Sequence, residues 1–116
     1  MSLEKNITLS MLLDFYGDML TDKQRETVDM YANEDLSLSE IAEITGLTRP
    51  GVRDRLVKSE KQLREWENTL GLLARFNDVR ERIAEITADL EALERGETKD
   101  IHSIVNAMKE LAKKEG

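Results

Sequence analysis

The stretch of residues 37–57 constrains the fold more than any other part of this chain. Ser37 is followed three residues later by Glu40, which is the capping-box signature of a helix start. Gly46 is placed to end that short helix in a left-handed conformation. Thr48 can then cap a second helix. Two helices joined by a three-residue turn that contains glycine predict a helix-turn-helix.

Side-chain size supports the same motif. Ala42 lies where the two helices would approach most closely, and only a small residue permits that approach. We expect Ile41 and Ile44 to face inward with it. Val52 and Leu56 follow at helical spacing and would anchor the second helix to the core.

The rest of the chain also reads as helical. Apolar residues recur at intervals of three and four, and the period-2 alternation of strands is missing, so we predict an all-α protein. A first helix is expected over Leu9–Leu20, and a second begins at a capping box formed by Thr21 and Gln24. A last helix is expected over about Ile101–Lys114. We predict a helical domain over residues 1–70 and a C-terminal helical segment over residues 71–116.

The C-terminal segment carries a heptad-like apolar seam, which suggests a partner helix. Near Phe76 the apolar residues follow successive intervals of three and skip the interval of four that a heptad requires. This irregularity should bend the seam, close to the weak helix formers Gly71 and Asn77. The seam is predicted to form a homodimer interface, and the alternative is a segment that folds back over the helix-turn-helix. Its residues are Leu70, Leu73, Phe76, Val79, Ile83, Ile86, Leu90 and Leu93.

The net charge of -7 conceals a division along the chain. Residues 10–47 hold nine acidic and two basic residues, whereas residues 48–64 hold six basic and two acidic ones. Since a phosphate backbone responds to the local charge of a protein surface more than to the net charge of the whole chain, the negative net charge does not exclude a nucleic-acid partner.

The basic helix is the candidate nucleic-acid surface. In a helix-turn-helix, the N-terminal part of the second helix meets base edges, and its flanks meet phosphates. Arg49 and Arg53 could each bind guanine, and Asp54 could accept a hydrogen bond from the amino group of cytosine. The alternatives are a solvated charged face or a helix-turn-helix that binds protein. The candidate residues are Thr48, Arg49, Pro50, Gly51, Arg53, Asp54, Arg55, Lys58 and Lys61.

Composition gives no support to an enzyme, a cofactor or a membrane protein. Cysteine is absent, which removes disulfides and thiolate sites. No apolar run approaches the ~20 residues of a membrane span, and no signal-peptide core is found, so a cytoplasmic protein is expected. Asp14 and Asp18 lie one turn apart and His102 stands alone, but neither has the partners that a metal or catalytic site requires.

Several runs resemble the YlxM family of small bacterial proteins. They are Leu20–Arg25 and Glu34–Glu43, preceded by Asp14–Tyr16 and followed by Leu70–Leu73, and the resemblance covers about residues 9–76. The helix-turn-helix is also similar to region 4 of sigma factors, which reads the promoter -35 element. The resemblance implies an all-helical protein with a long, often dimerising C-terminal helix. It also implies an accessory or regulatory role in the signal recognition particle pathway, because YlxM genes typically neighbour those of the particle and its receptor.

This chain departs from the family at two positions of the second helix. The family usually reads Ser-Arg-Gln-Ala/Gly-Val-Tyr-Asp where residues 48–54 stand here, and the glutamine and tyrosine are replaced by Pro50 and Arg53. We therefore expect a non-enzymatic helix-turn-helix homodimer that binds DNA, or alternatively RNA, and acts with signal recognition particle components. A transcription regulator unrelated to targeting and a protein-docking module are the alternatives.

Overall fold

A computed structural model describes the backbone of residues 3–115 and the side chains of residues 7–113. Within that part of the chain the fold is all-α, as predicted, and it contains no strand. The chain divides into two compact units, residues 1–73 and residues 74–116. The elements are α1 (Leu3–Tyr16), the 3-10 helix η1 (Gly17–Met19), α2 (Asp22–Ala32), α3 (Leu38–Thr45), α4 (Arg49–Leu70), α5 (Leu72–Glu94) and α6 (Ile101–Glu115).

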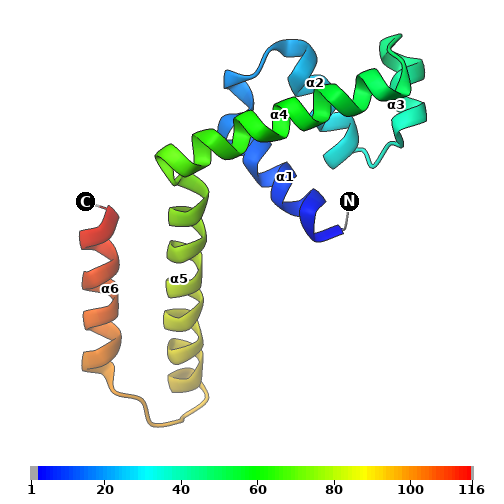
Figure 1. The fold of residues 1–116 in the computed structure, drawn as a ribbon. Helices are drawn as coiled ribbons and strands as arrows, with labels where there is room; N and C mark the ends of the chain where they lie inside the picture. The colour runs from blue at the N-terminus through cyan, green and yellow to red at the C-terminus, as the bar shows by residue number, and fades with distance from the viewer. Residues whose placement is uncertain (1–2, 116) are drawn as a thin grey trace. The chain divides into compact units, whose positions relative to one another are not determined.

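The first unit is built around α4, which contacts α1, α2 and α3 (Figure 1). Its core collects the apolar faces of these helices, and burying each large side chain there contributes about 1.5–3 kcal/mol. One apolar face of α1 is buried in full in this core. The buried apolar residues are Leu9, Leu12, Leu13, Tyr16, Leu20, Val28, Ile41, Val52, Leu56, Leu63 and Leu73.

The first helix differs from the predicted range of residues 9–20. It begins at Leu3 and ends at Tyr16, and a 3-10 turn follows. Gly17 is buried there, and a Cβ at this position would lie 3.1 Å from Leu13 Cδ1. The tighter turn leads to an extended Leu20, whose side chain lies in the core. The α-helix thus ends earlier than the apolar spacing indicated, and Leu20 still reaches the core.

The orientation predicted for Ile44 was wrong. Ile41 is fully buried and Ala42 packs against the core, but Ile44 is 61% exposed. The side of α3 that meets the core is set by Leu38, Ile41 and Ala42. A helix of only eight residues has too few turns for apolar spacing alone to fix its buried side.

The interruption of the C-terminal seam lies at Gly71 and not near Phe76. Gly71 ends α4 with a φ of +63°, and α5 starts at the next residue. Phe76 lies inside the unbroken α5. Leu70 therefore belongs to the end of α4, and Leu73 is buried in the core of the first unit. Glycine adopts the left-handed conformation without the steric cost of a Cβ, which favours the break at this position.

The second unit is a hairpin of α5 and α6 (Figure 1). Gly96, at a φ of +88°, ends α5, and the Glu97 amide donates to the Ala92 carbonyl at 3.0 Å. Asp100 begins α6, because its carboxylate accepts from the Ser103 hydroxyl at 2.8 Å and from the His102 amide at 3.0 Å. The buried residues are Ile86, Ala92, Ile104 and Leu111. Of the predicted seam, Ile86 is thus buried within the hairpin, a partner that neither sequence-based interpretation included, while Phe76, Ile83 and Leu90 stay exposed.

Candidate nucleic-acid interface

The turn between α3 and α4 is fixed by caps at both ends. The Ser37 hydroxyl accepts from the Glu40 amide at 3.1 Å, and the Glu40 carboxylate accepts from the Ser37 amide at 2.9 Å. The Ser37 amide first, and the Ser37 hydroxyl second, lower the pKa of Glu40 because they stabilise its charged carboxylate. Gly46 ends α3 at a φ of +77°, where its amide donates to the Ala42 carbonyl. The predicted caps of the helix-turn-helix are all present.

The start of α4 is held at the surface by its own cap and by core anchors. The Gly51 amide donates to the Thr48 hydroxyl at 3.1 Å, and Pro50 occupies the first turn. Val52 is fully buried, Leu56 nearly so. Because these anchors recur at a spacing of four, the residues between them are turned toward solvent. The N-terminal half of α4 is therefore a rigid helix with one solvated face.

Most of the predicted site residues lie on that solvated face. The exposed ones are Thr48, Arg49, Pro50, Arg53, Asp54, Lys58 and Lys61, while Gly51 and Arg55 are half-buried. A run of one helix thus presents several basic side chains to solvent, with a single acidic one among them. Such an arrangement can meet the phosphates and base edges of nucleic acid.

Arg55 has a partner within the protein. Its guanidinium donates to the Thr27 hydroxyl at 3.3 Å, and that buried hydroxyl itself donates to the Lys23 carbonyl at 2.8 Å. The hydrogen bonds link α4 to α2 beneath the solvated face. We therefore expect Arg55 to position α4, whereas sequence reasoning gave it a phosphate contact.

Val57 is a residue of this face that sequence reasoning missed. It is 54% exposed, on the same side of α4 as Arg53 and Lys61. An exposed β-branched residue one turn after an arginine of the second helix was the available signal. An apolar side chain in this position can contact a thymine methyl group.

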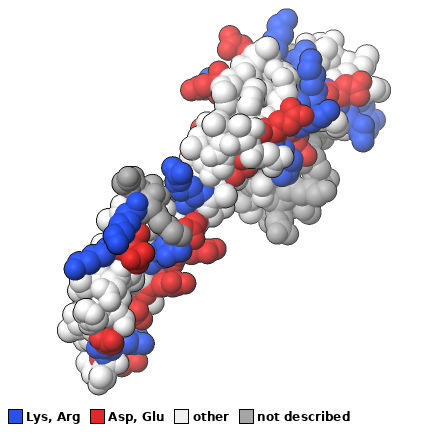
Figure 2. Space-filling model, turned by 60° about the vertical axis from the view of Figure 1, so that its left-hand side comes forward, with Lys and Arg blue, Asp and Glu red and all other residues white. Residues whose placement is uncertain are grey.

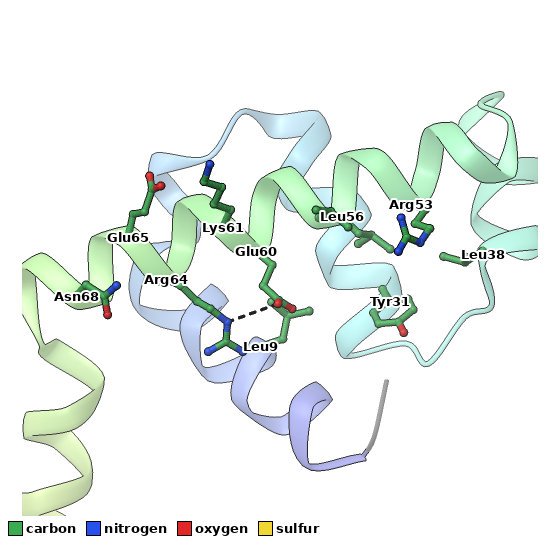
Figure 3. A pocket seen from close by; sticks show the side chains of 11 residues that line it. Leu9, Tyr31, Leu38, Arg53, Leu56, Glu60, Lys61, Arg64, Glu65 and Asn68 are labelled. Atoms are coloured by element: carbon green, nitrogen blue, oxygen red, sulfur yellow. Dashed lines mark hydrogen bonds and ion pairs between the residues drawn. The ribbon is translucent and has the colours of Figure 1, made fainter.

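A groove of about 760 Å³ runs beside the basic face (Figure 3). Leu9, Tyr31, Leu38 and Leu56 line it with apolar surface, contributed by α1, α2, α3 and α4. Arg53, Lys61 and Arg64 lie along it on α4, and Arg64 is paired with Glu60 at 3.5 Å. The groove and the solvated face of α4 thus share Arg53, Val57 and Lys61.

Acidic side chains lie between the basic ones on the surface of the first unit (Figure 2). A hollow between α1 and α2 is lined by five acidic residues, and Asp18 there pairs with Arg25 at 3.0 Å. Among the described residues, no group of three or more His, Asp and Glu side chains could hold a metal ion. Nor does any helix in that part of the chain have the length and apolar character that crossing a membrane requires.

Comparison with known proteins identifies a family and relatives that this chain resembles. Residues 3–104 match a family described as "Putative helix-turn-helix protein, YlxM / p13 like". The match continues well past residue 76, where the resemblance seen in the sequence ended, and reaches the start of α6.

Curated relatives match along most of their length. A UPF0122 protein of Thermoanaerobacter sp. (strain X514) is 37% identical over 108 residues, which cover 89% of this chain and 92% of that protein. A UPF0122 protein of Bacillus thuringiensis (strain Al Hakam) is 36% identical over 109 residues, which cover 94% and 98% of the two chains. One from Desulforamulus reducens is 38% identical over 89 residues, which cover 77% and 76%.

Proposed function

This chain belongs to the UPF0122 family of YlxM / p13-like helix-turn-helix proteins, and on that premise we propose that it binds duplex DNA through the N-terminal half of α4, without catalysis. The observation that carries the proposal is the solvated face of α4. There Arg49, Arg53, Lys58 and Lys61 are exposed on a helix that is capped at its start and anchored by Val52.

Duplex DNA suits this face better than duplex RNA. The major groove of B-form DNA admits an α-helix, whereas the A-form major groove is too narrow for side chains to read. Arg49 and Arg53 would approach guanine edges, Asp54 a cytosine amino group and Val57 a thymine methyl. Lys58 and Lys61 would contact phosphates along the flanks.

The proposed DNA-binding form is a homodimer held together by the second unit, so that each assembly carries two copies of α4. A two-fold assembly suits operators with two related half-sites. We also propose an accessory or regulatory role in the signal recognition particle pathway. Its support is the family resemblance alone, and it makes the particle RNA the competing ligand to test.

Fluorescence anisotropy with two labelled ligands tests the proposal. The ligands are duplex DNA from the region upstream of the protein's own gene and the particle RNA, each at low and at physiological salt. Since each neutralised phosphate releases counterions, binding should weaken steeply with salt. Replacing Arg49 and Arg53 by alanine should weaken binding about 30-fold or more, since each arginine–guanine contact is worth about 1–3 kcal/mol.

A matched control removes two basic residues elsewhere. The double variant Arg95→Ala/Lys99→Ala changes the loop of the second unit and loses the same charge, so its affinity should stay within about threefold of the unchanged protein. Tighter binding to the RNA would favour the accessory role over the regulator. Equal losses in both double variants would mean that charge alone, and not the face of α4, attracts the nucleic acid.

The groove beside α4 gives a specific reason to test protein docking as a second candidate function. Apolar lining with charged side chains at its edge is typical of sites that accept an amphipathic helix. If neither nucleic acid binds even at low salt, the particle's GTPase is the partner to test, with Val57→Asp, at an exposed residue of the groove, as the variant that should abolish docking. A loss of nucleic-acid binding in Arg49→Ala/Arg53→Ala would instead exclude docking as the sole function.

A further inference from the structure

The second unit leaves large apolar side chains on its surface. Six of them are between 41% and 62% exposed: Phe76, Ile83 and Leu90 on α5, and Ile101, Val105 and Met108 on α6. Monomeric proteins rarely leave so many apolar side chains together on a small hairpin. Residues 74–116 are also close to the size of about 40 residues below which a unit usually needs a disulfide, a metal or a partner. The chain has no cysteine.

The exposed apolar residues of α5 form one stripe at heptad spacing. Ile83 comes three residues before the buried Ile86, and Leu90 comes four residues after it. At about 100° per residue, both positions are rotated from Ile86 by about 40–60° in the same sense. The stripe therefore lies beside the contact with α6 and on one side of it.

The stripe of α6 lies on the same face of the hairpin. Ile101 and Met108 stand three before and four after the buried Ile104, which repeats the offsets found on α5. The two helices run in opposite directions (Figure 1). In antiparallel helices, an equal rotation from the shared contact brings both stripes to the same side. We call this surface the apolar face of the hairpin.

Charge is distributed unequally along the hairpin. The half near its open end, residues 74–83 and 108–113, holds five basic and three acidic residues. The half that includes the loop, residues 84–107, holds six acidic and two basic residues. Lys and Arg side chains are seen at the open end of this unit (Figure 2). The hairpin is thus basic at its open end and acidic at its loop end.

We infer that the apolar face binds the same face of a second copy, in an antiparallel arrangement in which the two loops lie at opposite ends and Ile83 lies near the two-fold axis. This inference rests on the proposed homodimer and specifies its geometry. The basic open end of each hairpin then meets the acidic loop end of the other.

Charge decides between the two arrangements that a two-fold axis allows. An axis parallel to the helices would bring the two open ends together and the two loops together, so that like charges face each other. An axis perpendicular to the helices pairs opposite charges and sets α5 against its own copy. Because Phe76 and Leu90 lie seven residues on either side of Ile83, each would then face the other in the partner copy.

Sedimentation velocity of the full-length protein, in the absence of nucleic acid, tests the face. We expect a dimer, and Ile83→Glu should weaken dimerisation at least tenfold while leaving the helix content unchanged, since Ile83 is exposed. Ile44→Glu places the same charge at an exposed isoleucine of α3 and should remain dimeric. A dimer that tolerates Ile83→Glu would overturn the assignment of this face.

Disulfide formation tests the arrangement, and the cysteine-free chain makes each introduced thiol unique. Under mild oxidation, Ile83→Cys should cross-link to itself. Phe76→Cys and Leu90→Cys should cross-link when mixed and much less when each is alone. Self-linking of Phe76→Cys without the mixed product would overturn the antiparallel arrangement.

The outcomes separate this inference from the proposals on which it builds. A wild-type protein that sediments as a monomer would overturn both the homodimer and its geometry. A dimer that fails the cross-linking pattern would overturn the geometry alone. Neither measurement involves DNA, so a failure of DNA binding is detected independently by the anisotropy experiment.

Discussion

The hydroxyl of Tyr16, at the end of α1, donates to Oε1 of Glu67 on α4 at 2.5 Å, across 51 residues of sequence. The pair also provides the acceptors for the first turn of α5. The Leu72 amide donates to the Tyr16 hydroxyl at 3.1 Å, and the Leu73 amide donates to the Glu67 carboxylate at 2.9 Å. Three helices thus meet at one partly buried polar cluster.

Removing the Tyr16 hydroxyl should therefore destabilise the first unit. Tyr16→Phe leaves the Leu72 amide and one Glu67 interaction without their partner, and a buried polar group left unpaired costs about 1–3 kcal/mol. We expect the free energy of unfolding in urea to fall by that amount. Tyr31→Phe, at a half-buried tyrosine, is the matched control and should change it by less than about 0.5 kcal/mol.

The same cluster predicts a loss of stability in alkali. Burial, together with the hydrogen bond to Glu67, raises the pKa of Tyr16 above its ordinary value of 10.0. Above pH 10 the unfolded chain loses this proton while the folded protein keeps it, so the contribution is complete below pH 10 and is lost as pH rises toward the folded pKa. Urea unfolding between pH 9 and pH 11 should show this decline in the wild-type protein. The same slope in Tyr16→Phe would assign the decline to other groups.

The cap of α3 makes a prediction for a single carboxyl group. Because the Ser37 amide and hydroxyl lower the pKa of Glu40, Ser37→Ala should raise that pKa toward its ordinary value of 4.5. The stabilisation from Glu40 is present above pH 4.5 and is lost as pH falls through the lowered pKa. An NMR titration of the Glu40 side-chain carbonyl carbon measures the shift directly. Ser39→Ala, two residues after the capping Ser37, should leave the titration of Glu40 unchanged.

Gly46 should be replaceable only at a conformational cost. A Cβ at this position would meet nothing within 4 Å, so the cost of Gly46→Ala comes from its φ of +77° alone. We expect a loss of about 1–2 kcal/mol in thermal or urea unfolding. Gly46→Asn should lose less, because asparagine tolerates the left-handed region better. Equal losses for both variants would point to a steric cause instead.

Replacing Val57 should weaken DNA binding without changing the stability of the protein. Because its side chain is mostly solvated, Val57→Ser should change the free energy of unfolding by less than about 0.5 kcal/mol. If Val57 contacts a thymine methyl, the same variant should weaken DNA binding severalfold on the preferred site. Replacing that thymine by uracil, which lacks the methyl, should remove the difference between wild type and variant.

The local signals that define the helix-turn-helix could be read from the sequence. Each cap of the motif, at Ser37 with Glu40, at Gly46 and at Thr48, uses a hydrogen-bond partner no more than four residues away. These hydrogen bonds and the left-handed turn therefore depend on neighbouring positions only. The same holds for the capping box at Thr21 and for the glycine turn that ends α5. Short-range chemistry of this kind needs no knowledge of the rest of the fold.

Interactions between distant segments decided what the sequence left open. Leu20 enters the core after the 3-10 turn that follows α1, and Arg55 turns toward Thr27, 28 residues away. The break at Gly71 is supported by Tyr16, and α6 supplies the partner of α5. Apolar spacing shows that a helix has a buried face, but only the packed structure shows which segment covers it, because several helices can offer a similar surface.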